Sequence, residues 1–171
     1  MPPEIQSYLE RLEDLRGQIR ALLQSIPAND LPEALNWRPL SGTDNHATNS
    51  LGVMSIHTAG AEHFWIGEVI GGMPPTRDRD AEFVAQIEDV HDIFSRLNIV
   101  EAETRTVMAW LTPGNLDETR LARGKLIPVR WIILHVIDHT ALHLGHMQLT
   151  YQLWMGGKSG KSPRWYERLP E

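Results

Sequence analysis

The sequence predicts an all-α protein, a four-helix bundle that forms one domain over residues 1–171. Apolar residues recur three and four positions apart in four long segments, which is the period of a helix with one buried side. Clusters of Pro, Gly, Asn and Asp separate these segments. No segment shows convincing strand character, so we expect helices packed on helices.

The first helix is expected over residues 3–26. Pro2 and Pro3 suit a helix start, where a backbone N–H is not needed, and Pro27 marks the end. Charged residues occupy the side opposite the apolar stripe. The stripe consists of Ile5, Tyr8, Leu9, Leu12, Leu15, Ile19, Leu22 and Leu23.

A loop without regular structure is expected to follow, up to residue 49, because this stretch is rich in turn-forming residues. Long loops in compact domains are often functional or packed over a site. Trp37 and Arg38 would therefore either close over a pocket or anchor the loop on the bundle. Arg164 and Trp165, near the other end of the chain, are open to the same two interpretations.

The second helix is expected over residues 50–70, with Asn49 or Ser50 as its cap. The pair Gly71-Gly72, followed by Pro74-Pro75, ends it.

The third and fourth helices are expected over residues 88–111 and 128–155. Residues 80–87 form a possible separate helical turn before the third helix. Pro113-Gly114 ends the third helix, and Gly156-Gly157 ends the fourth. Pro128 fits the first turn of the fourth helix.

Charge and composition exclude several classes of function. The net charge of −6 argues against a nucleic-acid partner, since phosphate binding needs clustered Lys and Arg. The chain has no cysteine, so a disulfide, a thiolate metal site and a cysteine nucleophile are all excluded. No signal peptide or membrane span is apparent. We expect a cytoplasmic protein that does not bind a membrane.

Four histidines on the fourth helix point to a metal. At about 100° per residue, His135, His139, His143 and His146 fall within about 80° of one another. Burying four imidazoles without a shared purpose is costly. Two imidazoles one turn apart can bind one divalent ion, such as Zn or Ni. Spacing alone does not choose among the pairs 135/139, 139/143 and 143/146.

A bundle site normally needs a further ligand from a facing helix, and His57 is the best candidate because it lies in mid-helix on the apolar side. His63 projects about 120° away from it and is expected at the surface or rim of the bundle. His46 and His91 lie in or near irregular segments and are expected to be solvated.

Several segments together resemble the DinB/YfiT-like superfamily of metal-dependent enzymes, over nearly the whole chain. The segment HVIDHTALHLGH resembles that superfamily's last-helix motif, and LGVMSIHTAGAEHFWIGEVIGG resembles its second helix. The shorter segments that share the resemblance are LNWRP at 35–39, RDRDAEF at 77–83 and RWYER at 164–168.

The resemblance implies metal ligands at His57, His139 and His143, in a four-helix bundle that runs up-down-down-up and is often dimeric. It also implies a small-molecule partner, such as a low-molecular-weight thiol, and thiol S-transferase or related transferase, isomerase or hydrolase chemistry. His146 stands where many relatives have Gln, and His135 would be a neighbour of the site.

Three protein ligands leave one coordination position open, which is typical of a catalytic metal site. His135 or His146 would then serve as a general base. Asp138 would either orient a histidine or be solvated. Two alternatives remain: a non-catalytic binding or stress-response module stabilised by its metal, and a metal-free bundle whose histidines face a polar pocket.

Overall fold

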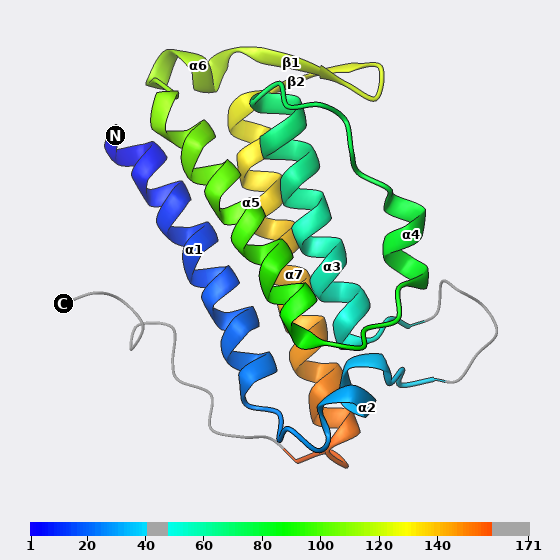
Figure 1. The fold of residues 1–171 in the computed structure, drawn as a ribbon. Coiled ribbons are helices and arrows are strands. Elements are labelled where there is room, and N and C mark those ends of the chain that lie inside the picture. The colour runs from blue at the N-terminus through cyan, green and yellow to red at the C-terminus, as the bar shows by residue number, and fades with distance from the viewer. Residues whose placement is uncertain (41–47, 159–171) are drawn as a thin grey trace.

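Four long helical stretches form the body of the computed structural model, which describes residues 1–40 and 48–158 (Figure 1). The helix α1 (Pro3–Gln24) contacts both α5 (Val90–Trp110) and α7 (Val129–Trp154). The helix α3 (Leu51–Glu62) contacts the same two. The expectation of a predominantly helical fold is therefore confirmed. The predictions for His46, Arg164 and Trp165 lie outside the described residues.

The predicted second helix has two parts. The Ser50 side chain accepts the backbone N–H of Val53 and caps α3. From His63 to Ile70 the helix continues with π geometry, as η1, and Gly71 donates its N–H to the Ile66 carbonyl, five residues back, at 2.9 Å. Gly72, at φ 69°, then adopts the left-handed conformation that glycine tolerates, so the predicted end is confirmed.

Two short helices occupy connecting segments. The helix α2 (Leu31–Asn36) lies within the stretch that was expected to have no regular structure, so that expectation is wrong. The helix α4 (Arg79–Val84) confirms the expected separate turn. Both pack against α3. The packing of α4 places residues that are distant from α7 in the sequence beside the site described below.

The expectation that the chain has no strand is also wrong. After α6 (Pro113–Asp117), strands β1 (Thr119–Ala122) and β2 (Lys125–Pro128) pair antiparallel, with Ala122 opposite Lys125. The two turn residues, Arg123 and Gly124, both have positive φ, at 50° and 74°. That geometry suits a two-residue hairpin. Pro128 is accordingly extended and precedes α7 instead of lying in its first turn.

A buried ion pair crosses the bundle interior. The Arg16 guanidinium on α1 donates to the Glu62 carboxylate on α3, and the Thr104 hydroxyl on α5 donates to the same carboxylate at 2.6 Å. Burial raises the pKa of Glu62, although Arg16 and Thr104 act in the opposite direction. Leaving either charge without its partner here would be costly, so the pair fixes how α1 and α3 meet.

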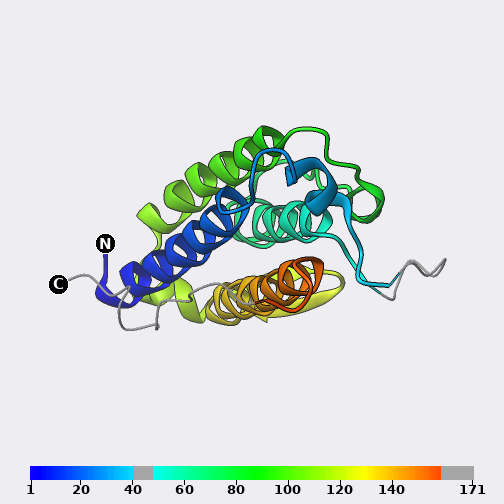
Figure 2. The same ribbon diagram turned by 90° about the horizontal axis from the view of Figure 1, so that it is seen from below.

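The helix α7 lies on one side of the bundle when the molecule is seen along its length (Figure 2). No helix among the described residues is long and apolar enough to span a membrane. One side of α7 carries large apolar residues that are exposed in the single chain. These are Trp131, Leu134, Leu142, Leu149 and Leu153.

Candidate metal centre

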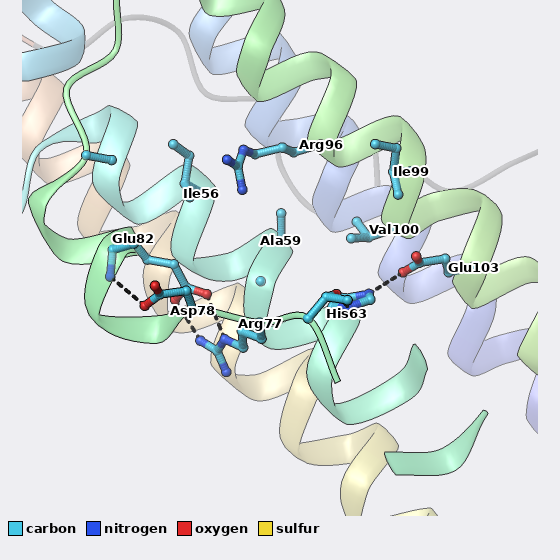
Figure 3. Close-up of a pocket in the computed structure, with 14 residues that line it drawn as sticks. Ile56, Ala59, His63, Arg77, Asp78, Glu82, Arg96, Ile99, Val100 and Glu103 are labelled. Carbon is cyan, nitrogen blue, oxygen red and sulfur yellow. Dashed lines mark hydrogen bonds and ion pairs between the residues drawn. The ribbon is translucent and has the colours of Figure 1, made fainter. Parts of the chain in front are cut away.

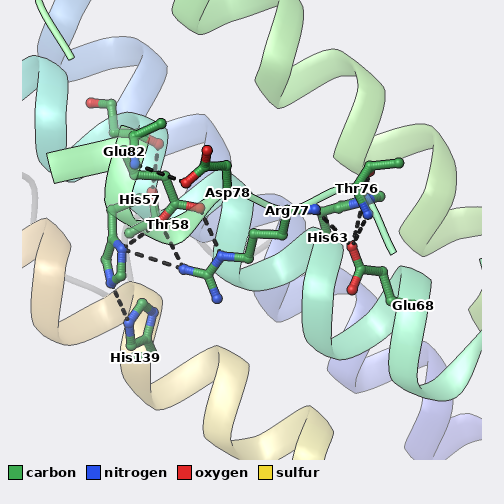
Figure 4. Close-up of polar contacts among 11 residues, drawn as sticks. His57, Thr58, His63, Glu68, Thr76, Arg77, Asp78, Glu82 and His139 are labelled. Atoms are coloured by element: carbon green, nitrogen blue, oxygen red, sulfur yellow. Dashed lines mark hydrogen bonds and ion pairs between the residues drawn. The ribbon is translucent and has the colours of Figure 1, made fainter. Parts of the chain in front are cut away.

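Three of the predicted histidines converge from two helices. The His57 Nε2 atom on α3 lies 3.2 Å from the His139 Nε2 atom on α7 (Figure 4). The His143 ring, one turn further along α7, has its centroid 5.0 Å from that of His57 and 4.5 Å from that of His139. One ligand nitrogen from each ring lies within 4.8 Å of the other two. His57 is buried, and the other two are half-buried.

The spacing of these rings suits a divalent metal ion. Two nitrogens bound tetrahedrally at about 2.0–2.1 Å from zinc lie roughly 3.3 Å apart, close to the separation of the Nε2 atoms of His57 and His139. The Nδ1 atoms of His139 and His143 are buried without a hydrogen-bond partner. Neither ring is therefore held by a protein group through its Nδ1 atom.

The electrostatics favour the same interpretation. Burial and the neighbouring histidines lower the pKa of His139 to about 3. Burial, with His57 and His146 nearby, lowers the pKa of His143 to about 4. Both imidazoles are therefore neutral at pH 7, which is the form that binds a metal.

Glu82 on α4 orients His57. Its carboxylate lies 2.8 Å from the His57 Nδ1 atom, which leaves Nε2 to face His139. Arg77 donates to both oxygens of the same carboxylate, at 2.7 and 2.8 Å (Figure 4). Burial would raise the pKa of Glu82, but the hydrogen bonds with Arg77 and His57 outweigh it, so the pKa lies below its ordinary value. A carboxylate in this position fixes the tautomer of a metal-binding histidine.

Glu82 and Arg77 were not predicted as site residues. The segment RDRDAEF drew attention only as part of a family resemblance, and nothing in its spacing links it to a histidine 25 residues earlier. The close approach depends on Gly60. A Cβ atom added at this glycine would lie 2.0 Å from the Glu82 Oε1 atom. The glycine at position 60 is thus a sequence feature from which this contact could have been inferred.

His135 and His146 flank the three converging rings without joining them. The His135 ring stacks on Trp131 with a centroid distance of 5.0 Å and an interplanar angle of 7°. Its centroid is 5.8 Å from that of His139, and burial lowers its pKa. His146 is exposed, and its ring centroid lies 5.7 Å from that of His143. The two residues thus lie on opposite ends of the histidine row.

The remaining described histidines lie outside the centre. The His63 Nδ1 atom is 2.7 Å from a Glu103 oxygen, and Nε2 is 2.9 Å from the Thr76 hydroxyl, in a half-buried polar network on η1. His91 is exposed beside Asp89, as expected. Asp138 is also exposed.

Arg38 acts as a loop anchor, one of its two predicted roles. Its guanidinium donates to the Thr48 and Phe83 carbonyl oxygens, each at 3.2 Å. The Phe83 ring in turn packs on His57, with centroids 4.8 Å apart. Arg38 therefore supports the wall of the site. Trp37 is the C-cap residue of α2 and is half-buried.

An apolar cavity of about 520 Å³ adjoins the centre. His143 and His146 form one part of its lining, so a molecule in the cavity would directly reach one of the three converging histidines. The rest of the lining is mostly apolar. It includes Pro39, Leu40, Met54, Leu149 and Leu153.

Comparison with known proteins identifies a family and a solved structure with a similar fold. The model of the mycothiol S-transferase family matches residues 9–154. A crystal structure of a conserved protein from Enterococcus faecalis has a similar fold, with a TM-score of 0.69 and 14% sequence identity. The similarity covers 88% of this chain and 96% of that one. A search of curated proteins finds no match.

Proposed function

Because the chain belongs to the mycothiol S-transferase family, we propose that it is a metal-dependent enzyme that transfers a low-molecular-weight thiol to an electrophilic small molecule. The observation that carries this proposal is the convergence of His57, His139 and His143 beside an apolar cavity. We propose zinc or nickel as the ion, since neutral imidazole suits both.

The histidines would hold the ion, and the residues around them would orient the rings and leave room for substrate. Three protein ligands leave a position for substrate, and a divalent ion there would lower the pKa of a substrate thiol. Glu82 keeps the Nδ1 atom of His57 engaged, so that Nε2 points to the centre. The chain has no cysteine, so no thiol of its own competes with the substrate.

His146 is well placed to accept the proton of the thiol. It lines the cavity together with His143 and is exposed, so it can pass the proton to solvent. His135 is the second candidate base, at the His139 end of the row, where stacking on Trp131 restrains its ring. The electrophile would occupy the apolar cavity, with its apolar part against Leu149 and Leu153.

Two further expectations belong with this proposal. The helices would follow the up-down-down-up path of the DinB-like bundles. A second copy of the chain would cover the exposed apolar residues Trp131, Leu134 and Leu142 of α7 and leave the cavity beside Leu149 and Leu153 open, which gives a homodimer; light scattering would measure this.

The proposal is tested by metal analysis and turnover of protein purified without a histidine tag. We expect about one zinc or nickel per chain, and thiol-dependent consumption of an electrophile such as a haloalkane. His139→Gln should remove the metal and the activity together, whereas His91→Gln, at an exposed histidine, should change neither. His146→Gln should retain the metal and lose turnover by about 10²–10⁴-fold if it is the base.

Two results would contradict the enzymatic proposal. Metal-replete protein that turns over no thiol with any electrophile would favour the alternative, a metal-stabilised binding or stress-response module. Protein that takes up no metal under any loading condition would favour the metal-free bundle.

A further inference from the structure

A second cavity, which Glu82 helps to line, lies between α3, α4 and α5 (Figure 3). Its volume is about 400 Å³, within the range of pockets that hold small ligands. We propose that this cavity binds a small amphipathic carboxylate. The proposed transferase activity does not require such a site.

One part of the cavity is apolar. Ile56 and Ala59 of α3 face Ile99 and Val100 of α5 across it (Figure 3). Gly60 has no side chain, so only its backbone lines the α3 side at this point and the cavity is deeper there. A short aliphatic chain would remove apolar surface from water here, which favours binding.

Most charged groups of the lining already have partners. Glu82 is paired with Arg77, and the Glu103 carboxylate lies 2.7 Å from the His63 Nδ1 atom. Asp78 accepts the backbone N–H of Ala81 at 3.0 Å and so caps α4. Each of these acidic groups therefore already contacts another side chain or a helix start.

Arg96 is the exception. Its guanidinium makes no hydrogen bond or ion pair with any residue in the part of the chain that the structure describes. The side chain reaches from α5 across the cavity towards Ile56 (Figure 3). An exposed, unpaired positive charge beside the apolar part of the lining matches a ligand with a carboxylate at one end and a short hydrocarbon chain at the other.

The cavity shares a wall with the metal centre. Arg77 and Glu82 line the cavity, and Glu82 also contacts the His57 Nδ1 atom. A ligand that moves this pair would alter the orientation of His57. Ligand and metal are then expected to change each other's affinity by the same factor, a step that rests on the proposed metal centre.

Three probes of equal chain length test the proposal: hexanoate, hexan-1-ol and hexylammonium. They are titrated into the metal-free full-length chain, and amide chemical shifts are followed. We expect hexanoate to bind most tightly and to shift the amides of Ala59, Gly60 and Val100. Arg96→Gln should weaken hexanoate about three- to fivefold and leave hexan-1-ol unchanged. Arg105→Gln, on the same helix but paired with Glu13 and Glu101, should have no effect.

Three outcomes of the first titration would contradict the proposal. Equal affinity for all three probes, tightest binding of hexylammonium, or shifts confined to residues near Leu149 would each overturn the assignment. In a second titration, zinc affinity is measured with and without saturating hexanoate; an unchanged zinc affinity would overturn the coupling. Because the first titration needs no metal, it succeeds or fails independently of the proposed transferase function.

Discussion

At the scale of single residues, the orientation of one imidazole decides whether a three-histidine centre can form. His57 approaches His139 through Nε2 because Glu82 occupies its other nitrogen. Arg77 holds Glu82 in turn with two hydrogen bonds. A buried carboxylate and a half-buried guanidinium thus hold one ring in place.

Replacing Glu82 by Gln should weaken metal binding about 10–100-fold. The carboxylate that orients the His57 ring is lost, whereas the metal-binding nitrogens of the three histidines remain. Isothermal titration of the metal-free protein with zinc measures the change. Asp80→Asn removes a carboxylate from the exposed first turn of the same helix and serves as the matched control. Equal affinities for the two variants would show that Glu82 does not position His57.

The sequence predicted which histidines converge, but not what supports them. Helical spacing predicted that neighbouring histidines of α7 share one side, and the family resemblance selected His139 and His143 among them. The apolar setting of His57 marked it as inward-facing. Glu82 belongs to a helix of six residues, too short to show a period. Its contact with His57 depends on how α4 folds back on α3, which is a tertiary property.

At the scale of elements, close packing between α3 and α4 sets the position of the Glu82 carboxylate. Gly60 lets the Glu82 carboxylate lie against the α3 backbone. The periodic segments predicted α1, α5 and α7 because each buries one long side, whereas α3 is buried almost all round and was predicted from its apolar composition and the glycines and prolines that follow. The hairpin could not be predicted in this way, since its four-residue strands have mostly exposed side chains and too few positions to reveal an alternation.

Gly60→Ala and Gly17→Ala form a matched pair of substitutions within helices. At Gly17 no atom lies within 4 Å of the added Cβ, so alanine should stabilise the protein by about 0.5–1 kcal/mol. At Gly60 the methyl group would displace Glu82, which should reduce zinc affinity. Urea denaturation and zinc titration measure the two effects. Unchanged zinc affinity in Gly60→Ala would mean that Glu82 still contacts His57 in spite of the added methyl group.

At the scale of the whole molecule, stability and protonation are linked through the histidine centre. Folding lowers the pKa of His139 and His143 to about 3 and about 4, below the ordinary value of about 6.5 in an unfolded chain. Between these values the unfolded chain binds more protons than the folded one. The contribution of these two residues to stability is therefore present above pH 6.5 and is lost as the pH falls towards 4.

Metal-free protein should accordingly become less stable between pH 7 and pH 4. The double variant His139→Gln, His143→Gln should lose stability less steeply over the same range, whereas His91→Gln should follow the parent chain. Urea denaturation at several pH values measures these slopes. Identical slopes for the parent and the double variant would contradict the lowered pKa values.

The three converging rings come from very unequal distances along the chain. His139 and His143 become neighbours as soon as α7 has formed, whereas His57 must close a loop of 82 residues to reach His139. The pair of His139 and His143 therefore needs only α7 to form, whereas the addition of His57 requires α3 to pack on α7. An ion bound by all three rings would join this local pair to a residue distant in the sequence, so metal binding would favour the packed fold over the isolated helix.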